Sequence, residues 1–391
     1  MSAPLRIGLV AGEASGDLLG AALINALRAV TADIEFVGLA GERMRAAGCE
    51  ALGSCEELAV MGLVEPLRHL PRLWRLRRNL ERSLLARQVD VFIGIDAPAF
   101  NLGLARRLRL CGCATVQYVS PQVWAWRPGR VRKIAAAVDC VLCLLPFEPA
   151  FYADHGVRAE FVGHPLADQI ALQPDRAAAR RELGLPAAAR VIAVMPGSRV
   201  AEVQRLGSDF AATARQLASA LRPAPHFVAP MASARVASIF RRQVSDCAAP
   251  VTLIDGRADT VLAAADAALV ASGTATLQAL LHGCPMVVAY RLAPVTAFLV
   301  RGLGLVKLRH FSQPNLLAGE TLVPEFFQEA VTPAALVPAL RAALLDEEQR
   351  HELKRHFRLI HEQLRRGAAA RAAHVVLELA QARRNAALAA S

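Results

Sequence analysis

Buried strands alternate with helical segments along most of the chain, and this alternation limits the fold more than any other feature. Near-continuous apolar runs such as RIGLVAGE, IEFVGLAG, VDVFIGIDA, ATVQYVS, CVLCLLP and AEFVG follow one another at intervals in the first half. Strands of this composition are buried on both faces, which is typical of parallel sheets covered by helices. The pattern restarts at RVIAVMPGSR and continues through PHFVAPM, VTLIDG, AALVASGT and PMVVAYR. We therefore predict an α/β protein with two doubly wound parallel sheets.

The chain length of 391 residues exceeds what one hydrophobic core usually supports, so two domains are expected. A helical connector, HPLADQIALQPDRAAARRELGLP, separates the two halves of the pattern. We predict an N-terminal domain over residues 1–170 and a second domain over 171–345. Residues 346–391 are expected to form helices that pack back on the first domain or on a partner subunit. Two such domains would leave a cleft, with ligands at the carboxyl ends of the strands.

The formal net charge of +11 predicts an anionic partner: nucleic acid, an acidic membrane surface or a phosphorylated substrate. Aromatic residues make up 5% of the chain, which disfavours a nucleic-acid platform of stacking rings. The short apolar run IGLVAG near the start is expected to be a strand and not a cleavable signal. Longer apolar runs are interrupted before they reach membrane-spanning length. We expect a cytoplasmic protein whose contact with a membrane is peripheral.

The eight cysteines are expected to remain thiols in a reducing cytosol. Cys111 with Cys113, and Cys140 with Cys143, have C-x-C and C-x-x-C spacings that also occur in zinc sites. The segment VDCVLCLLP, however, is predicted to be a buried strand, where side chains three apart point to opposite faces. Core thiols are therefore favoured over a metal, and no cofactor is predicted.

Two motifs in the first half place carboxylates where strands end. GEASGDLLG lies at the junction of the first strand and its helix, and Ser15 or Asp17 there is either a helix cap or part of a site. Glu13 of the same motif is less readily explained as a cap. GIDAPAFN places Asp96 after a very apolar strand, either as a turn former before Pro98 or as a base whose pKa is raised in a dry cleft.

Two motifs in the second half suit an anionic ligand. MPGSRVAEV ends a strand in a Pro-Gly turn, and its arginine can hold a diphosphate through two parallel hydrogen bonds. ASGTATLQALL offers small residues and hydroxyls at a helix start, although an ordinary capped helix would also explain it. The chain has neither a D-x-D pair nor a P-loop motif, which disfavours a metal-bridged sugar nucleotide and a P-loop NTPase.

Two basic segments carry all three tryptophans. LRHLPRLWRLRRNLERSLLARQ, residues 67–88, combines an apolar stripe with arginines, so it either lies in a membrane interface or packs its stripe on the sheet. YVSPQVWAWRPGRVRK, residues 118–133, follows a strand and is expected at the rim of the cleft, on the acceptor side. Its rings would form apolar walls while its basic residues meet phosphate.

Taken in order, these motifs resemble the lipid-A-disaccharide synthase family of bacterial glycosyltransferases. The matching segments include AGEASGD, MGLVEPL, GIDAPAFN, YVSPQVWAWRPGRVRKI, LPFEPAFY, FVGHPLAD, MPGSRVAEV, ASGTATLQALL, CPMVVAYR and QPNLLAG, and they span almost the whole chain. The resemblance implies the GT-B fold, in which two Rossmann-like domains face a central cleft. It also implies transfer of 2,3-diacylglucosamine from its UDP carrier to the 6-hydroxyl of 2,3-diacylglucosamine 1-phosphate, forming the β-1,6 disaccharide of lipid A.

The resemblance implies an inverting transfer, which needs a base for the acceptor hydroxyl. Asp96 is the predicted base, and Glu13 is a second candidate or a holder of the acceptor sugar. The UDP-sugar lipid donor is expected in the second domain, and the phosphorylated lipid acceptor and an anionic inner-membrane surface are expected at the first. The predicted nucleotide site comprises Gly197, Ser198, Arg199, Ser272, Gly273, Thr274, Ala275, Thr276, Gln278 and Asn315, and the predicted acceptor and lipid site comprises Ser15, Asn101, Trp124, Trp126, Arg127, Trp74, Arg72 and Arg75.

The chain departs from the family at Gln278, where the family usually has a glutamate that accepts hydrogen bonds from the ribose hydroxyls. A glutamine carbonyl still accepts, but without charge assistance, so nucleotide binding is expected to weaken by about 1 kcal/mol. Other UDP-sugar enzymes of the same fold, such as an N-acetylglucosaminyltransferase or a 2-epimerase, are the alternative; they should lack GIDAPAFN and SPQVWAW. A basic nucleic-acid-binding protein is the remaining alternative.

Overall fold

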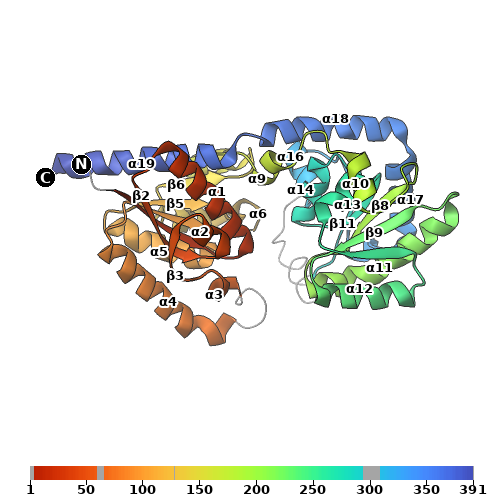
Figure 1. Cartoon of the computed structure of the whole chain (residues 1–391), viewed down its shortest axis with the longest axis horizontal. Coiled ribbons are helices and arrows are strands. Elements are labelled where there is room, and N and C mark those ends of the chain that lie inside the picture. Colours follow the sequence, from red (N-terminus) through yellow and green to blue (C-terminus); the bar gives the residue numbers. More distant parts are fainter. Residues whose placement is uncertain (1–3, 60–65, 127, 294–308, 391) are drawn as a thin grey trace. The chain divides into compact units, whose positions relative to one another are not determined.

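The computed structural model describes residues 4–59, 66–126, 128–293 and 309–390 (Figure 1). The chain divides into two compact units, one formed by residues 1–168 with 364–391 and the other by residues 169–363. The expected C-terminal segment 346–391 is thus divided near Leu364, and its first helix belongs to the second unit. No helix in the described ranges is long and apolar enough to cross a membrane.

The first unit contains a seven-stranded parallel sheet in the order β3-β2-β1-β4-β5-β6-β7. The predicted parallel sheet is confirmed, and only the edge strand β3 was not expected. The residues of β3 are mostly exposed or half-buried, so they lack the continuous apolar run that identifies the inner strands. The strands are β1 (Leu5–Ala11), β2 (Ile34–Ala40), β3 (Cys49–Ser54), β4 (Val91–Ile95), β5 (Ala114–Tyr118), β6 (Cys140–Cys143) and β7 (Ala159–Phe161).

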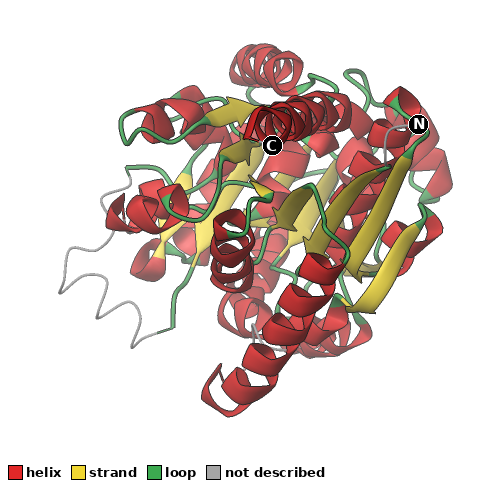
Figure 2. Ribbon diagram, turned by 90° about the vertical axis from the view of Figure 1, so that its left-hand side faces the viewer, coloured by secondary structure: helices red, strands yellow, loops and turns green. Residues whose placement is uncertain are grey.

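Helices cover both faces of this sheet (Figure 2). Apolar residues of α1 and α19 pack on one face, and those of α4, α5 and α7 pack on the other. Cys140 belongs to the first of these cores and Cys143 to the second, so the two thiols point to opposite faces as predicted. The helices are α1 (Ala14–Val30), α2 (Glu42–Ala46), α3 (Glu56–Ala59), α4 (Pro66–Ala86), α5 (Pro98–Leu110), α6 (Val123–Trp126), α7 (Val131–Ala135), α8 (Glu148–Ala153), α9 (Pro165–Gln169) and α19 (Ala368–Ala390).

Helix α19 joins the first unit from the far end of the chain. Its first turn is capped by the carboxylate of Asp168, which accepts hydrogen bonds from the backbone N–H groups of Gly367 at 2.9 Å and Ala368 at 2.6 Å. Near its other end, Arg384 contacts the carboxylate of Asp90 at 3.0 Å. A carboxylate at a helix N-terminus satisfies free donors and interacts favourably with the helix dipole. These polar contacts hold both ends of the helix against the sheet.

The second unit contains a six-stranded parallel sheet in the order β10-β9-β8-β11-β12-β13. Its core is closed by α11, α12 and α17. The three-residue edge strand β13 was not expected from the sequence, because it is too short to show a pattern. The strands are β8 (Val191–Met195), β9 (His226–Met231), β10 (Val251–Asp255), β11 (Ala267–Ala271), β12 (Met286–Tyr290) and β13 (Glu325–Phe327). The helices are α10 (Arg176–Glu182), α11 (Val200–Ala220), α12 (Ala234–Asp246), α13 (Ala258–Ala264), α14 (Thr274–Leu281), α16 (Gln313–Ala318), α17 (Pro333–Leu345) and α18 (Glu347–Leu364).

A buried carboxylate lies beneath the tryptophan segment of the first unit. Glu148, at the start of α8, is 3% exposed and accepts hydrogen bonds from the backbone N–H of Leu145 at 3.1 Å and the indole N–H of Trp124 at 3.2 Å. The Ser120 hydroxyl lies beside it and is 3.0 Å from the hydroxyl of Tyr152. Burial raises the pKa of Glu148 from 4.5 to about 7, although these hydrogen bonds oppose the shift.

The raised pKa predicts how the stability of the first unit depends on pH. Because the folded state binds the Glu148 proton more tightly than the unfolded chain does, its contribution is fully present below pH 4.5 and is lost as the pH rises to about 7. The neutral variant Glu148→Gln should remove this dependence. The difference in free energy of unfolding between the two proteins should therefore change by on the order of 3 kcal/mol over that range.

Tryptophan fluorescence during urea unfolding measures this change, since all three tryptophans, Trp74, Trp124 and Trp126, belong to the first unit. Glu42→Gln, which replaces an exposed carboxylate of the same unit, is the matched control and should leave the pH profile as in the original protein. Parallel profiles for Glu148→Gln and the original protein would contradict the predicted titration.

Candidate active site

The first half-site lies at the carboxyl edge of the first sheet, where the chain makes a strained turn after β4. Asp96 and Ala97 both have positive φ, 53° and 41°, and neither is a glycine. Such residues are uncommon, and they persist only where the surrounding structure holds them. The turn begins α5 with Pro98 in its first turn, a position that needs no N–H donor. The Asp96 side chain is half-buried and has no hydrogen-bond or ion-pair partner within the described part of the chain.

Two buried amides hold this turn. The backbone carbonyl of Asp96 accepts hydrogen bonds from the side chains of Asn101, at 2.8 Å, and Gln117, at 3.1 Å. Gln117 also reaches the carbonyl of Val119 at 3.4 Å, and Val119 has a φ of 74°, which is rare for a β-branched residue. Asn101 and Gln117 are 0% and 1% exposed. Asn101, expected to contact the acceptor, is therefore placed here as a support of the turn after β4.

Glycines allow the backbone to pack closely around the same turn. A Cβ atom at Gly12 would lie 2.5 Å from the Cβ of Ala97, and one at Gly94 would lie 2.7 Å from the Cβ of Asn101. Both distances are shorter than real contacts allow, so only glycine fits without a shift. Since β1 pairs with β4 and Gly12 follows β1, these contacts bring the motifs AGEASGD and GIDAPAFN together.

Glu13 is exposed at the start of α1, beside the turn of Asp96. Its side chain does not cap the helix and has no partner among the described residues. Ser15 is also exposed, whereas Asp17 is 5% exposed and accepts hydrogen bonds from the N–H groups of Gly41, Arg43 and Met44. Asp17 is thus a cap for α2 and not for its own helix. Among the described residues, Glu13 and Asp96 are the carboxylates at this edge that remain open.

The tryptophan segment follows β5 at the same edge. Trp124 is half-buried in α6, its indole packs edge-on against Phe147 with ring centroids 4.9 Å apart, and its N–H donates to Glu148. The side chain of Trp126 and all of Arg127 lie outside the described residues. Trp124 follows β5 at the carboxyl edge of the first sheet, and the contacts described for it, with Phe147 and Glu148, lie within its own unit.

Helix α4 packs part of its apolar stripe in the first unit and leaves a tryptophan and several arginines exposed. Leu80 and Leu84 are buried in the core of the first unit, as a packing helix requires. Trp74 is 49% exposed and lies under the guanidinium of Arg78, 4.8 Å from the ring centroid. Arg75 is exposed too, and Arg72, also exposed, forms an ion pair with Glu57 at 3.2 Å.

The second half-site begins where β8 ends, at Gly197, Ser198 and Arg199. The carboxylate of Glu202 accepts hydrogen bonds from the backbone N–H groups of Ser198 at 3.0 Å and Arg199 at 3.2 Å. Gly197 has a φ of 126°, and a Cβ there would lie 2.5 Å from Glu202. The backbone N–H groups of Ser198 and Arg199 are therefore already paired, and the exposed guanidinium of Arg199 is the group left for an anion. It lies 3.7 Å from the carboxylate of Glu202.

A second loop of this half-site joins β11, the neighbour of β8, to α14. Gly273, Thr274 and Ala275 are accessible at the helix start, and Gly273 has a φ of 149° that favours glycine. Ser272 donates to the carbonyl of Phe311 at 3.0 Å, and Thr276 is buried, donating to the carbonyl of Gly273 at 2.8 Å. One turn in, the side-chain N–H of Gln278 donates to Asp259 at 3.3 Å.

Asn315 does not lie open at this edge. It is 0% exposed, its amide donates to the carbonyl of Val323 at 2.9 Å, and its carbonyl accepts from Leu322 and Val323. The structure places it as a brace for the loop after α16 and not as an open nucleotide contact.

Sequence reasoning assigned no role to Gln117, Glu148 or Glu202. Gln117 could have been found as the one amide inside the apolar strand ATVQYVS. Glu148 is part of LPFEPAFY and follows a buried strand, which is also an unusual place for a carboxylate. Glu202 stands three residues after Arg199, the spacing of a helix-capping residue. Each of these residues stood out by its type and position, but the sequence did not show which group its side chain would contact.

Comparison with known proteins identifies the family of the chain. Residues 7–378 match the family model of lipid-A-disaccharide synthetase. A lipid-A-disaccharide synthase of Xanthomonas campestris pv. campestris (strain 8004) is 51% identical over 97% of this chain and 87% of its own length. One from Pseudomonas aeruginosa (strain UCBPP-PA14) is 52% identical over 98% of this chain and 100% of its own.

Solved structures share the fold at low identity. A calicheamicin glycosyltransferase superposes with a TM-score of 0.57 at 18% identity, covering 97% of this chain and 98% of its own. The UDP-GlcNAc 2-epimerase of Neisseria meningitidis, solved with UDP-GlcNAc bound, gives 0.58 at 11% identity, covering 96% and 99%. The fold alone therefore does not distinguish a glycosyltransferase from an epimerase, whereas the Xanthomonas and Pseudomonas relatives, which match nearly the whole of this chain, are both lipid-A-disaccharide synthases. The chain belongs to the lipid-A-disaccharide synthetase family and is a GT-B glycosyltransferase of lipid A biosynthesis.

Proposed function

We propose that the enzyme transfers 2,3-diacylglucosamine from UDP-2,3-diacylglucosamine to the 6-hydroxyl of 2,3-diacylglucosamine 1-phosphate, with inversion at the anomeric carbon. The products are the β-1,6-linked disaccharide 1-phosphate and UDP. The observation that carries this proposal is the open carboxylate of Asp96, held on a strained turn by buried amides. Family membership supplies the lipid A context, and the Neisseria epimerase is an example of this fold with a UDP-sugar bound.

Asp96 is the proposed general base. In a single displacement the acceptor oxygen attacks the anomeric carbon, the bond to the diphosphate breaks, and the hydroxyl proton passes to a carboxylate. A half-buried carboxylate without a cationic partner is suited to accept that proton, and the fixed turn limits its positions. Glu13, exposed at the neighbouring strand end, is proposed to hold the acceptor sugar.

The second unit is proposed to bind the UDP group. Arg199 is the exposed cation of its half-site, and the start of α14 adds free N–H groups and the positive end of a helix dipole. Together they would stabilise the negative charge that develops on the departing diphosphate. Because the Gln278 amide donates to Asp259, its carbonyl oxygen is available to accept hydrogen bonds from the ribose.

The first unit is proposed to rest on the anionic cytoplasmic face of the inner membrane of a Gram-negative bacterium, where both lipid substrates reside. The exposed tryptophan and arginines of α4 suit this contact, since an indole ring and cationic side chains are favourable at a charged lipid interface. The buried leucines of the same helix anchor it to the protein. A dimer, if formed, would be compatible with this placement and is not required by it.

Asp96→Asn tests the base. Asparagine tolerates the same left-handed backbone, so the turn should persist while proton transfer is lost. We expect kcat to fall by roughly 10²–10⁴-fold, with UDP affinity unchanged. The assay measures UDP release and disaccharide formation from the two lipid substrates. Near-normal turnover in this variant would remove Asp96 from the mechanism.

Glu13→Gln is the comparison for that experiment. A residue that holds the acceptor should raise KM for the acceptor more than it lowers kcat, whereas a base should lower kcat. If Glu13→Gln loses turnover to the extent expected of Asp96→Asn, the two roles are exchanged.

Arg199→Gln tests the nucleotide half-site. Loss of one charge-assisted contact should weaken UDP binding by about 10- to 100-fold, measured by calorimetry with UDP alone. Arg215→Gln is the control, because Arg215 is an exposed arginine of α11, the helix that Arg199 precedes. At roughly 3.6 residues per turn, it lies about four turns from Arg199. Equal UDP affinities for the two variants would contradict the proposed role of Arg199.

Replacing Arg72, Arg75 and Arg78 with glutamine tests the membrane surface. With roughly 1 kcal/mol per arginine near an anionic bilayer, partitioning onto phosphatidylglycerol vesicles should fall by more than tenfold at low salt. Vesicle sedimentation measures this. The control replaces three exposed arginines of the second unit with glutamine, which removes the same charge; they are Arg235, Arg241 and Arg242. Equal losses in both variants would show a nonspecific effect of net charge.

A further inference from the structure

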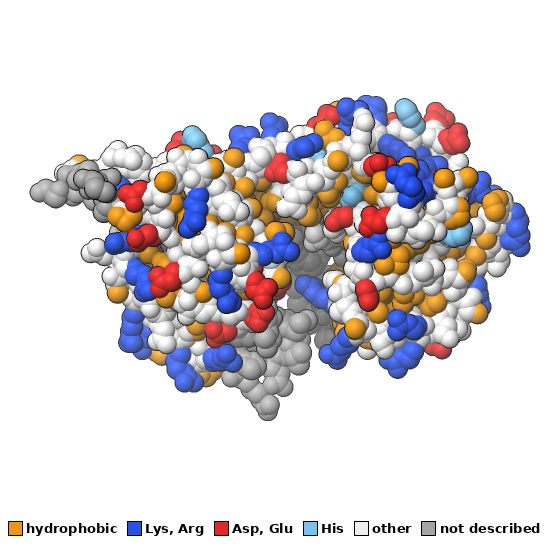
Figure 3. Space-filling model, viewed as in Figure 1, with side chains coloured by type: hydrophobic (Ala, Val, Ile, Leu, Met, Phe, Trp, Pro, Cys, Tyr) orange, Lys and Arg blue, Asp and Glu red, His pale blue; other side chains and the backbone are white. Residues whose placement is uncertain are grey.

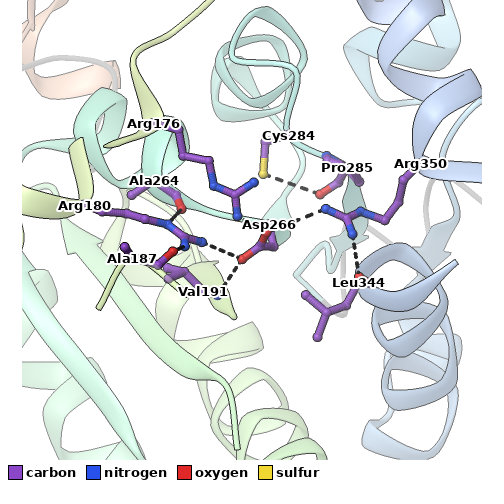
Figure 4. Close-up of polar contacts among 10 residues, drawn as sticks. All are labelled: Arg176, Arg180, Ala187, Val191, Ala264, Asp266, Cys284, Pro285, Leu344 and Arg350. Carbon is purple, nitrogen blue, oxygen red and sulfur yellow. Dashed lines mark hydrogen bonds and ion pairs between the residues drawn. The ribbon is translucent and has the colours of Figure 1, made fainter. Parts of the chain in front are cut away.

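A group of cations surrounds one carboxylate in the second unit (Figure 4). Asp266 precedes β11, and its carboxylate accepts hydrogen bonds from the N–H of Val191 and from Arg180, both at 2.8 Å. Arg176 contacts the same carboxylate, and Arg350 approaches it to 3.6 Å from the start of α18. Three guanidinium groups from two helices therefore converge on a single negative charge.

Positive charge in this region exceeds the negative charge that the protein supplies. Lys354 adds a fourth cation, and within the described ranges no carboxylate lies at ion-pair distance from it. Burial, together with Arg350 and Arg176, lowers the pKa of Lys354. The neighbouring Cys284 does not compensate, because burial raises its pKa to about 12 and keeps it a neutral thiol. The cations repel one another, so an added anion would be stabilised here.

A pocket opens beside this cluster. It has a volume of about 270 Å³ and is lined by Arg176, His282, Lys354 and Arg358, with Phe357 among its apolar walls. We call it the Lys354 pocket. Figure 3 shows Lys and Arg side chains gathered on this unit near α10 and the start of α18. The volume lies below the roughly 300–1,000 Å³ of sites for drug-sized ligands, so a small anionic group is the occupant that fits.

Two buried nitrogen atoms in this region have no hydrogen-bond partner among the described residues. They are Nε of Arg350 and Nδ1 of His282, whose other ring nitrogen lies 3.1 Å from Asp259. Buried donors are nearly always paired, so the unpaired Nε–H of Arg350 favours an added hydrogen-bond acceptor at the cation cluster. His282 does not add to this argument, because Asp259 accepts from its Nε2 atom and Nδ1 of the neutral ring is then itself an acceptor.

The Lys354 pocket is separate from the nucleotide half-site. Two of its lining residues precede strands: Arg176 lies before β8, and His282 lies between α14 and β12. The half-site residues Arg199 and Thr274 follow strands of the same sheet. A strand of five residues spans about 16 Å, so Arg199 and Thr274 lie at the opposite edge of the sheet from Arg176 and His282, although Gln278 and His282 both contact the carboxylate of Asp259.

We propose that the Lys354 pocket binds a phosphate group, at a second anion site independent of the nucleotide. Arginine and lysine side chains around a small pocket are the usual partners of phosphate, because planar guanidinium groups donate in parallel to two oxygens. A phosphate dianion would supply two of the missing negative charges. The group is carried either by free phosphate or by a lipid headgroup, which share this chemistry.

The test uses the full-length protein saturated with UDP and follows its melting temperature as inorganic phosphate is added at constant ionic strength. Lys354→Gln removes a pocket cation that has no ion-pair partner to disturb. Arg355→Gln is the matched control, because Arg355 is the next residue, is also exposed and does not line the pocket. We expect phosphate to raise the melting temperature of the original protein and the control, and Lys354→Gln to need about tenfold more phosphate.

A second arm distinguishes the two sources. Phosphatidylcholine vesicles containing phosphatidate are sedimented with the same three proteins. Binding that is weakened by Lys354→Gln and not by Arg355→Gln, without a response to free phosphate, assigns the site to a lipid headgroup. The proposal is overturned if Lys354→Gln behaves as the control does in both arms, or if UDP suppresses the response to phosphate. None of these outcomes depends on transferase activity.

Discussion

The strained turn at Asp96 and Ala97 is the constraint on which the first half-site depends. Two successive left-handed residues without glycine cost on the order of 1–3 kcal/mol each and would relax unless held. The amides of Asn101 and Gln117 hold the carbonyl of Asp96 from two sides, in a buried setting where unpaired groups are costly. The carboxylate is therefore oriented by groups that need not touch a substrate, and its position is set before binding.

Close packing joins this turn to the neighbouring strand end. The glycine of AGEASGD leaves space for Ala97, and the glycine of GIDAPAFN leaves space for Asn101. A larger residue at either position would displace the backbone that carries a carboxylate. The two motifs thus act as one structural unit, although about eighty residues separate them in the chain. Gln117 extends this unit to β5 and the tryptophan segment, which Glu148 holds from below.

The positive charge of the chain is divided among surfaces with different chemistry. On α4 the arginines are exposed beside a tryptophan, which suits a lipid surface. Arg199 is a single exposed cation at a strand end, with Glu202 occupying the adjacent N–H groups. Around Asp266 the cations are partly buried and outnumber their carboxylate. Net charge predicted an anionic partner, but burial and neighbouring side chains decide which anion would suit each surface.

The amino-acid pattern by itself determined the inner strands, their parallel arrangement and the position of the main motifs at strand ends, because burial on both faces requires continuous apolar runs. Tertiary structure alone decided the edge strands β3 and β13, which are short or exposed. It also decided that Asn101 and Asn315 are buried supports, and that Asp168 caps a helix about two hundred residues away. Local patterns report burial, whereas the partner of a polar group depends on which distant segments the topology brings together.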